Sequence, residues 1–233
     1  MSDTAIIKPN RAAARLVGVI ASPAALRRAL RLRRTPDFFE LRLDALRESL
    51  GEVVRAIPKL HTPLIVTARH PAEGGLGGLN TSARRDLLLR FLEHAAVVDL
   101  ELRSVNQMAA LVQELRQRRV PVIISRHYLQ RMPPRAELLR LTRSAVPWRP
   151  DILKIVTRTD DPPQLARLLA FFLEQNHNPL PLAAMGTGKL GLASRLQLDR
   201  LGSALTYVSI GQQIVEGQPS LSRLRCARRA YIR

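Results

Sequence analysis

The chain is poor in several residue types, and each shortage narrows what it can be. Cys226 is its one cysteine, so an intrachain disulfide and a zinc cluster built from cysteines are both excluded. Phe, Trp and Tyr make up only 4% of the residues, which argues against the stacking surfaces of an RNA-binding module. No apolar run is long enough to predict a transmembrane helix. We therefore expect no membrane contact and a reducing, cytoplasmic location.

Acidic side chains are scarce relative to basic ones, which gives a formal net charge of +18. Such a field attracts nucleic acid, an anionic surface or small anionic metabolites, or it only reflects arginines that solvate the outer helices. The sequence has no glycine/arginine tract, no RNP-like motif and no helix-turn-helix pattern. We therefore expect no nucleic-acid partner, and a small anionic substrate is the partner that we test against the residues below.

The chain shows no linker, internal repeat or low-complexity tract. Its first residues, MSDTAIIKPNRAAAR, lack the apolar stretch and cleavage site of a signal peptide. The interpretation is a flexible N-terminal lead, residues 1–14, followed by one catalytic domain, residues 15–233.

Short β-branched runs alternate with amphipathic stretches along the whole chain. The expected strands are Leu16–Ala21, Phe38–Leu43, Leu64–Ala68, Val97–Leu102, Val122–Ser125, Ile152–Thr157, Leu180–Met185 and Ala204–Ser209. The clearest expected helices are Arg84–His94, Met108–Arg118 and Pro163–Glu174. This alternation predicts the α/β class and a single, parallel, eight-stranded (β/α)8 TIM barrel. A doubly wound open sheet is the alternative, although no G-x-G-x-x-G follows the first strand.

Polar side chains interrupt the predicted strands at or near their carboxyl ends, where a buried strand should stay apolar. They are Glu40, Arg42, Asp44, Arg69, Glu73, Asp99, Glu101, His127, Lys154, Thr187 and Lys189, and the apolar Met185 leads to Thr187 on the seventh strand. Side chains two apart share one face of a strand, and the carboxyl ends of barrel strands meet at one mouth. Burial of so many polar groups for stability alone is costly, so we predict a ligand site at this mouth.

Lys154 is the sharpest candidate, because it stands inside the apolar run ILKIV. One interpretation is a buried ion pair with Glu101 or Asp99. The other is an amine that desolvation and nearby arginines keep neutral, and so nucleophilic toward a carbonyl. Imine formation acidifies the adjacent carbon, and His127, at the end of the preceding strand, is placed to move that proton. Either Glu73 or Glu101 is expected to orient the His127 ring.

The order and spacing of short motifs over nearly the whole chain resemble the type I 3-dehydroquinate dehydratases, Schiff-base lyases of the shikimate pathway. The matching segments are Glu40-Leu-Arg42-Leu-Asp44, Thr67-Ala-Arg69, Glu73-Gly74-Gly75, Asp99-Leu-Glu101, Ser125-Arg-His127, Asp151-Ile-Leu-Lys154, Gly191-Leu-Ala-Ser194-Arg195, Gly202-Ser203 with Thr206-Tyr207, and Gly217-Gln218.

The resemblance implies that Lys154 forms an imine with the C3 ketone of 3-dehydroquinate. By the same resemblance, His127 takes the C2 proton and protonates the departing C1 hydroxyl, and Glu73 orients His127. It also implies substrate contacts from Glu40, Arg42, Arg69, Arg195, Gln218 and Met185. Arg195 and Gln218 would hold the substrate carboxylate, because the planar arginine fork suits that group. The resemblance implies no metal or organic cofactor, and it implies that the chain forms a homodimer.

The closing segment departs from the family pattern. Ile214-Val215-Glu216 replaces a Ser-Ala-Pro, so a serine contact to the carboxylate is missing and an acid stands nearby. Two other functions remain open. An imine-forming aldolase would use Gly186-Thr187-Gly188-Lys189 as a phosphate-binding turn. A non-catalytic basic module binding RNA or an anionic surface would not depend on Lys154.

Overall fold

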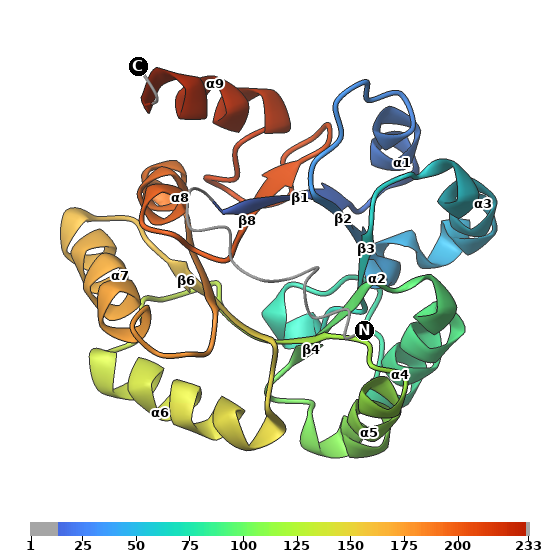
Figure 1. Cartoon of the computed structure of the whole chain (residues 1–233), viewed down its shortest axis with the longest axis horizontal. Coiled ribbons are helices and arrows are strands. Elements are labelled where there is room, and N and C mark those ends of the chain that lie inside the picture. The colour runs from blue at the N-terminus through green and yellow to red at the C-terminus, as the bar shows by residue number, and fades with distance from the viewer. Residues whose placement is uncertain (1–13, 232–233) are drawn as a thin grey trace.

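The computed structural model describes residues 14–231, which form a ring of parallel strands with helices around it (Figure 1). The strands are β1 (Arg15–Ile20), β2 (Phe38–Arg42), β3 (Leu64–Thr67), β4 (Val97–Glu101), β5 (Val122–Tyr128), β6 (Ile152–Arg158), β7 (Leu182–Thr187) and β8 (Leu205–Ser209). Their order is β7-β6-β5-β4-β3-β2-β1-β8. Where β7 meets β8, the Ala204 N–H donates to the Leu182 carbonyl at 2.9 Å. The predicted barrel is confirmed, and the open-sheet alternative is wrong.

The helices follow the strands in the order that a barrel requires. They are α1 (Pro23–Ala29), α2 (Leu43–Leu46), α3 (Leu50–Ala56), α4 (Thr81–Arg90), α5 (Ala109–Gln117), α6 (Arg135–Ala145), α7 (Pro162–Gln175), α8 (Gly191–Arg200) and α9 (Leu221–Tyr231). Side-chain caps fix several of the starts: Ser22 accepts from the Ala25 N–H at α1, Asn80 from the Ala83 N–H at α4, and Asp161 from the Gln164 N–H at α7. Within the described residues, no helix is both long and apolar enough to span a membrane.

Two apolar layers separate the interior of the barrel from its outer face. The larger layer lies between strands and helices and includes Phe39, Leu41 and Leu100. The smaller one fills the lumen with one face of each strand: Val17, Val19, Phe38, Ile65, Val97, Ile123, Ile152, Val156, Ala183, Met185, Ala204, Leu205 and Tyr207. This lumen layer closes the barrel from below, so the polar side chains above it meet at the carboxyl ends of the strands.

Some predicted boundaries move for identifiable reasons. β5 runs on to Tyr128 because it pairs with β6 as far as Thr157, so His127 lies within the strand. β7 begins at Leu182 rather than Leu180, since Pro181 has no N–H to donate to a ladder. Of the predicted N-terminal lead, residues 1–13 lie outside the described residues.

The placement of Asp44 on the lumen face of the second strand is wrong. β2 ends at Arg42, and Asp44 belongs to helix α2. Its carboxylate accepts the backbone N–H groups of Arg69 at 3.0 Å and Leu76 at 2.9 Å, and it holds Arg42 by two hydrogen bonds. Asp44 therefore ties the β2 end to the loop after β3, and it does not line the site.

Candidate active site

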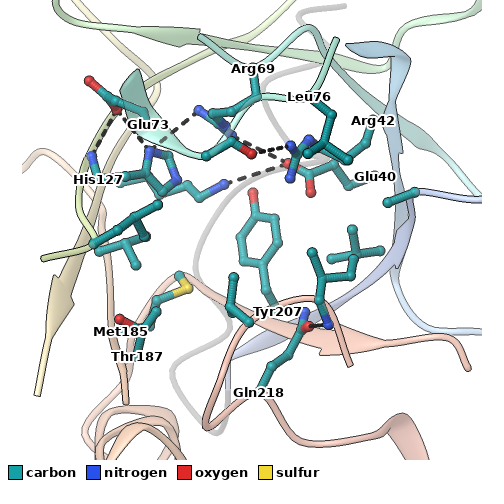
Figure 2. Close-up of a pocket in the computed structure, with 18 of the residues that line it drawn as sticks. Glu40, Arg42, Arg69, Glu73, Leu76, His127, Met185, Thr187, Tyr207 and Gln218 are labelled. Carbon is teal, nitrogen blue, oxygen red and sulfur yellow. Dashed lines mark hydrogen bonds and ion pairs between the residues drawn. The ribbon is translucent and has the colours of Figure 1, made fainter. Parts of the chain in front are cut away.

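A cavity of about 290 Å³ opens at the carboxyl ends of the strands. Every side chain predicted to have a catalytic or substrate-contact role lines it: Lys154, His127, Glu73, Glu40, Arg42, Arg69, Arg195, Gln218 and Met185. Of the other polar residues predicted at the mouth, Asp99, Glu101 and Lys189 do not line it. The size is at the lower end of the range for ligand pockets, which suits a small metabolite. Figure 2 shows Glu40, Arg42, Arg69, Glu73 and His127 along one side of the cavity, with Met185, Thr187 and Gln218 opposite them.

The strand register brings Lys154 and His127 to one corner of this cavity. Lys154 on β6 stands opposite Ser125 on β5, and His127 lies two residues further along β5. Because side chains alternate by two, Ser125 and His127 point into the lumen from the same face as Lys154. His127 therefore lies one step closer to the mouth than the lysine.

Lys154 is only 3% exposed and sits between carboxylates and an aromatic ring. Its Nζ donates to Asp99 Oδ2 at 2.9 Å and lies 3.6 Å from Glu40 Oε1. The same nitrogen lies over the Tyr207 ring, 3.8 Å from the centroid. The predicted ion pair thus exists, and its partner is Asp99 rather than Glu101. It holds the amine in place at the cavity wall.

Arg69 is the centre of a buried charge network beside the lysine. Its guanidinium contacts Asp99 through two hydrogen bonds of 3.2 and 3.0 Å, Glu101 at 3.0 Å and the Ser125 hydroxyl at 2.8 Å. Burial alone would lower the pKa of Arg69, but the carboxylates of Asp99, Glu101 and Glu40 hold it well above its ordinary value. Burial alone would raise the pKa of Asp99, yet Arg69 and Lys154 keep it far below its ordinary value. Arg69 and Asp99 therefore stay charged and paired with each other.

Glu73, rather than Glu101, contacts the His127 ring; the sequence had left both carboxylates open for this position. Its Oε2 accepts the His127 backbone N–H at 2.8 Å and lies 3.0 Å from Nδ1. Arg69 Nη1 lies further from the same Nδ1, at 3.5 Å. The shorter contact assigns the ring proton to Nδ1 and leaves Nε2 as a free acceptor. Gly75 permits this loop, because a Cβ there would stand 2.1 Å from the Arg69 carbonyl.

The electrostatics of this corner favour a neutral histidine. Burial and the positive charges of Arg69 and Lys154 lower the pKa of His127 well below its ordinary value. Burial and the charge of Glu101 raise the pKa of Glu73, although Arg126 and Arg69 oppose that effect. A neutral imidazole beside an amine is arranged to accept a proton from a bound molecule.

The opposite end of the cavity holds a buried cation that has no counterion among the described residues. Arg195 is 2% exposed, and its Nη1 donates only to Met185 Sδ at 3.2 Å and the Tyr207 carbonyl at 3.1 Å. Its Nε has no hydrogen-bond partner. Among residues 14–231, no carboxylate lies within ion-pair distance of it, and burial lowers the pKa of Arg195 to about 10. This arrangement is suited to an anion supplied by a ligand.

The loop after β8 brings Gln218 to the Arg195 end. Gln218 Oε1 accepts the Ile214 N–H at 3.2 Å, so the amide is oriented by its own loop (Figure 2). Gly217, with φ of 80°, packs where a Cβ would meet the Gly191 Cα at 2.6 Å. Glu216 does not line the cavity. Its Oε2 pairs with Arg158 Nη2 at 3.0 Å and thereby connects this loop to the end of β6.

Comparisons with known proteins agree with this geometry. The sequence model of the family described as "Type I 3-dehydroquinase" matches residues 20–231. The chain belongs to the type I 3-dehydroquinase family. The predicted family, and with it the hydro-lyase class, is confirmed.

Relatives of the type I 3-dehydroquinase family resemble the chain over most of its length. The 3-dehydroquinate dehydratase of Thermococcus gammatolerans is 30% identical over 212 residues, covering 90% of this chain and 95% of the relative. The crystal structure of 3-dehydroquinate dehydratase from Geobacillus kaustophilus gives a TM-score of 0.83 at 25% identity, covering 97% of this chain and 93% of that one. The carboxyl transferase domain of Rhizobium etli pyruvate carboxylase, at 13% identity and a TM-score of 0.69, shares the fold alone.

Sequence reasoning missed one member of the 3-dehydroquinase site's charge network. Arg84, on α4, is fully buried and forms an ion pair with Glu101, and its side chain also donates to the Ala68 carbonyl at 2.7 Å. A signal was present, because Arg84 has helical spacing with Leu88 and Phe91, which are both buried. An arginine at a core-facing position of a helix predicts a buried acidic partner.

Proposed function

We propose that this chain converts 3-dehydroquinate into 3-dehydroshikimate and water through an imine at Lys154. The observation that carries the proposal is that one cavity contains a buried amine, a neutral histidine and an uncompensated guanidinium. The amine and the histidine supply covalent and proton-transfer chemistry. The guanidinium of Arg195, with Gln218 beside it, supplies the seat for a carboxylate.

The reaction proceeds in balanced steps. Lys154 gives up one proton to His127 and adds to the C3 ketone as a neutral amine. That proton returns to the former ketone oxygen, which leaves as water, and an iminium remains. The iminium draws electrons from the neighbouring carbon, and His127 Nε2 takes the C2 proton to give an enamine. The enamine expels the C1 hydroxyl as water, which takes its proton from His127. Hydrolysis of the remaining imine releases the product and restores the amine.

The surrounding side chains act by positioning Lys154 and His127. Glu73 holds the His127 ring with Nε2 free, and Asp99 with Glu40 holds Lys154 at the wall. Arg69 is engaged by Asp99, Glu101 and the Ser125 hydroxyl, so its main part is to hold this network in place, and its predicted contact with the substrate is part of the same proposal. The predicted contacts of Glu40, Arg42 and Met185 with the substrate are part of the same proposal, as is the absence of any metal or organic cofactor. Homodimeric assembly and a cytoplasmic location rest on the family resemblance and on composition.

The aldolase alternative finds no support at the turn on which it depends. The Gly188 N–H already donates to the Glu216 carbonyl at 3.1 Å, and the Lys189 N–H donates to Asp160 Oδ1 at 2.9 Å. The Lys189 side chain is exposed and does not line the cavity. A phosphate at this turn would have to displace both hydrogen bonds.

Borohydride reduction tests the imine directly. Wild-type protein incubated with 3-dehydroquinate and borohydride should gain one covalent adduct, and peptide mapping should place it on Lys154. Lys154→Met, which keeps the length of the side chain without the amine, should gain none and should lose at least about a thousandfold in kcat. Absence of an adduct on the wild-type chain, by intact-protein mass spectrometry, would refute the mechanism.

A further inference from the structure

Tyr207 lies in the floor of the cavity and is not used by the steps above. It is a lumen-facing residue of β8, opposite Val17 on β1, and is only 3% exposed. In Figure 2 its side chain rises from the Gln218 side of the cavity, and its hydroxyl points toward Glu40 and Arg42. The residue therefore spans the distance between the carboxylate seat and the charged network.

The face of the Tyr207 ring contacts the reacting nitrogen. Lys154 Nζ lies 3.8 Å from the ring centroid, well inside the range of a cation–π interaction. Desolvation strengthens such an interaction, and Lys154 and Tyr207 are both buried. Among the described side chains around this nitrogen, Tyr207 is the one whose contact requires no N–H group.

This distinction matters when the imine forms. An ammonium nitrogen carries three N–H groups, whereas the iminium nitrogen carries one and keeps the positive charge. With one N–H, the iminium can donate to at most one of these two carboxylates, whereas the ammonium donates to Asp99 and also lies 3.6 Å from Glu40. The ring face interacts with the charge itself, so its contact persists in the intermediate.

The hydroxyl of Tyr207 is a second unused feature. It is buried and has no hydrogen-bond partner among the described residues. Burial raises the pKa of Tyr207 well above its ordinary value, and the charges of Glu40 and Asp99 act in the same direction. The phenol thus keeps its proton and remains a donor, and a buried donor without an acceptor is costly unless a ligand supplies one.

We propose that Tyr207 is a further catalytic residue, whose ring face stabilises the iminium at Lys154 and whose hydroxyl donates a hydrogen bond to a ring hydroxyl of the bound substrate. The hydroxyl serves the end of the substrate near Glu40 and Arg42, away from Gln218. This inference rests on the proposed imine mechanism. It assigns separate effects to the two parts of one side chain.

Two substitutions separate these parts. Tyr207→Phe keeps the ring and removes the hydroxyl, so KM should rise several-fold while the rate of borohydride trapping at saturating substrate stays close to that of the wild type. Tyr207→Leu removes the ring as well, so kcat and the trapping rate should fall by roughly a further tenfold. Tyr128→Phe is the matched control, because that phenol lies outside the cavity, and its kinetics should equal those of the wild type.

The outcomes distinguish the inference from the function on which it rests. Equal trapping rates for Tyr207→Phe and Tyr207→Leu, both folded by melting temperature, would overturn the role of the ring. An unchanged KM in Tyr207→Phe would overturn the role of the hydroxyl. A wild-type chain that forms no adduct would overturn the imine mechanism and the inference together, whereas normal wild-type trapping with unaffected variants would overturn the inference alone.

Discussion

The two ends of the active-site cavity treat buried charge in opposite ways. At the end near Lys154, five charged side chains pair with one another: Glu40, Arg69, Asp99, Glu101 and Lys154. At the other end, Arg195 is equally buried and has no carboxylate beside it among the described residues. A paired network holds its own shape, whereas an unpaired cation raises the energy of the empty site until an anion arrives. The end near Lys154 therefore holds its side chains in fixed positions, and the end near Arg195 is suited to binding an anionic group of the substrate.

Removing one charge from the paired network near Lys154 should cause the largest loss in the free energy of unfolding. Glu101→Gln removes a negative charge that serves both Arg69 and Arg84, and it leaves two guanidinium groups undercompensated in the interior. We expect the free energy of unfolding to fall by about 3–5 kcal/mol, measured by urea denaturation. Glu114→Gln is the matched control, since its exposed ion pair with Arg118 should contribute less than about 0.5 kcal/mol. Equal losses in the two variants would contradict the contrast between the ends.

Removing the buried cation at the Arg195 end should weaken substrate binding without lowering the free energy of unfolding. Arg195→Met removes the seat of the carboxylate, so kcat/KM should fall by at least about 30-fold, mainly through KM. The free energy of unfolding should stay the same or rise, because an uncompensated buried charge disappears. Steady-state kinetics and urea denaturation on the same preparation check both. A loss of stability as large as that of Glu101→Gln would mean that Arg195 is a structural residue.

The same contrast shows which parts of the molecule its sequence could predict. Polar residues two apart at the ends of Phe38–Arg42 and Val97–Glu101 predicted the site, because strand alternation and barrel closure are local rules. Glu40, Lys154 and His127 line the cavity for that reason. Arg195 and Gln218, on a helix and a loop, were predicted from the family resemblance alone.

The ion-pair partners of individual side chains were harder to predict from the sequence, since they depend on where separate helices, strands and loops meet. Lys154 had two candidate acids on β4, on the far side of β5, and only the register and the reach of Arg69 decide for Asp99. Arg84 reaches Glu101 from a helix, and Glu216 reaches Arg158 across the mouth. None of these three contacts follows from strand alternation. Assigning them requires the positions of these elements in the folded barrel.

The paired end should also govern the response to acid. His127 has a pKa lowered below the unfolded value of 6.5, so the unfolded chain binds its proton first as the pH falls. Its contribution to stability is complete above about pH 6.5 and is lost as the pH falls toward the lowered folded pKa, by up to about 1.4 kcal/mol per pH unit. His127→Gln should flatten this slope in urea unfolding between about pH 6.5 and 5. Parallel slopes in the two proteins would show that the histidine titrates normally.

The smallest expected effect concerns the loop that carries Gln218 to the unpaired end. Glu216 and Arg158 form an ion pair across the mouth, with side chains 54% and 31% exposed, so solvent screens it strongly. Glu216→Gln should raise KM a few-fold at most at low salt, because the loop is held less firmly, and should leave kcat unchanged. Added salt should raise the wild-type KM toward that of the variant and change the variant less. Arg158→Gln should reproduce the KM of Glu216→Gln, and the double variant should add nothing to it. A drop in kcat in Glu216→Gln would instead place this loop in the chemistry at Lys154, and the division between a capturing end and a reacting end would fail.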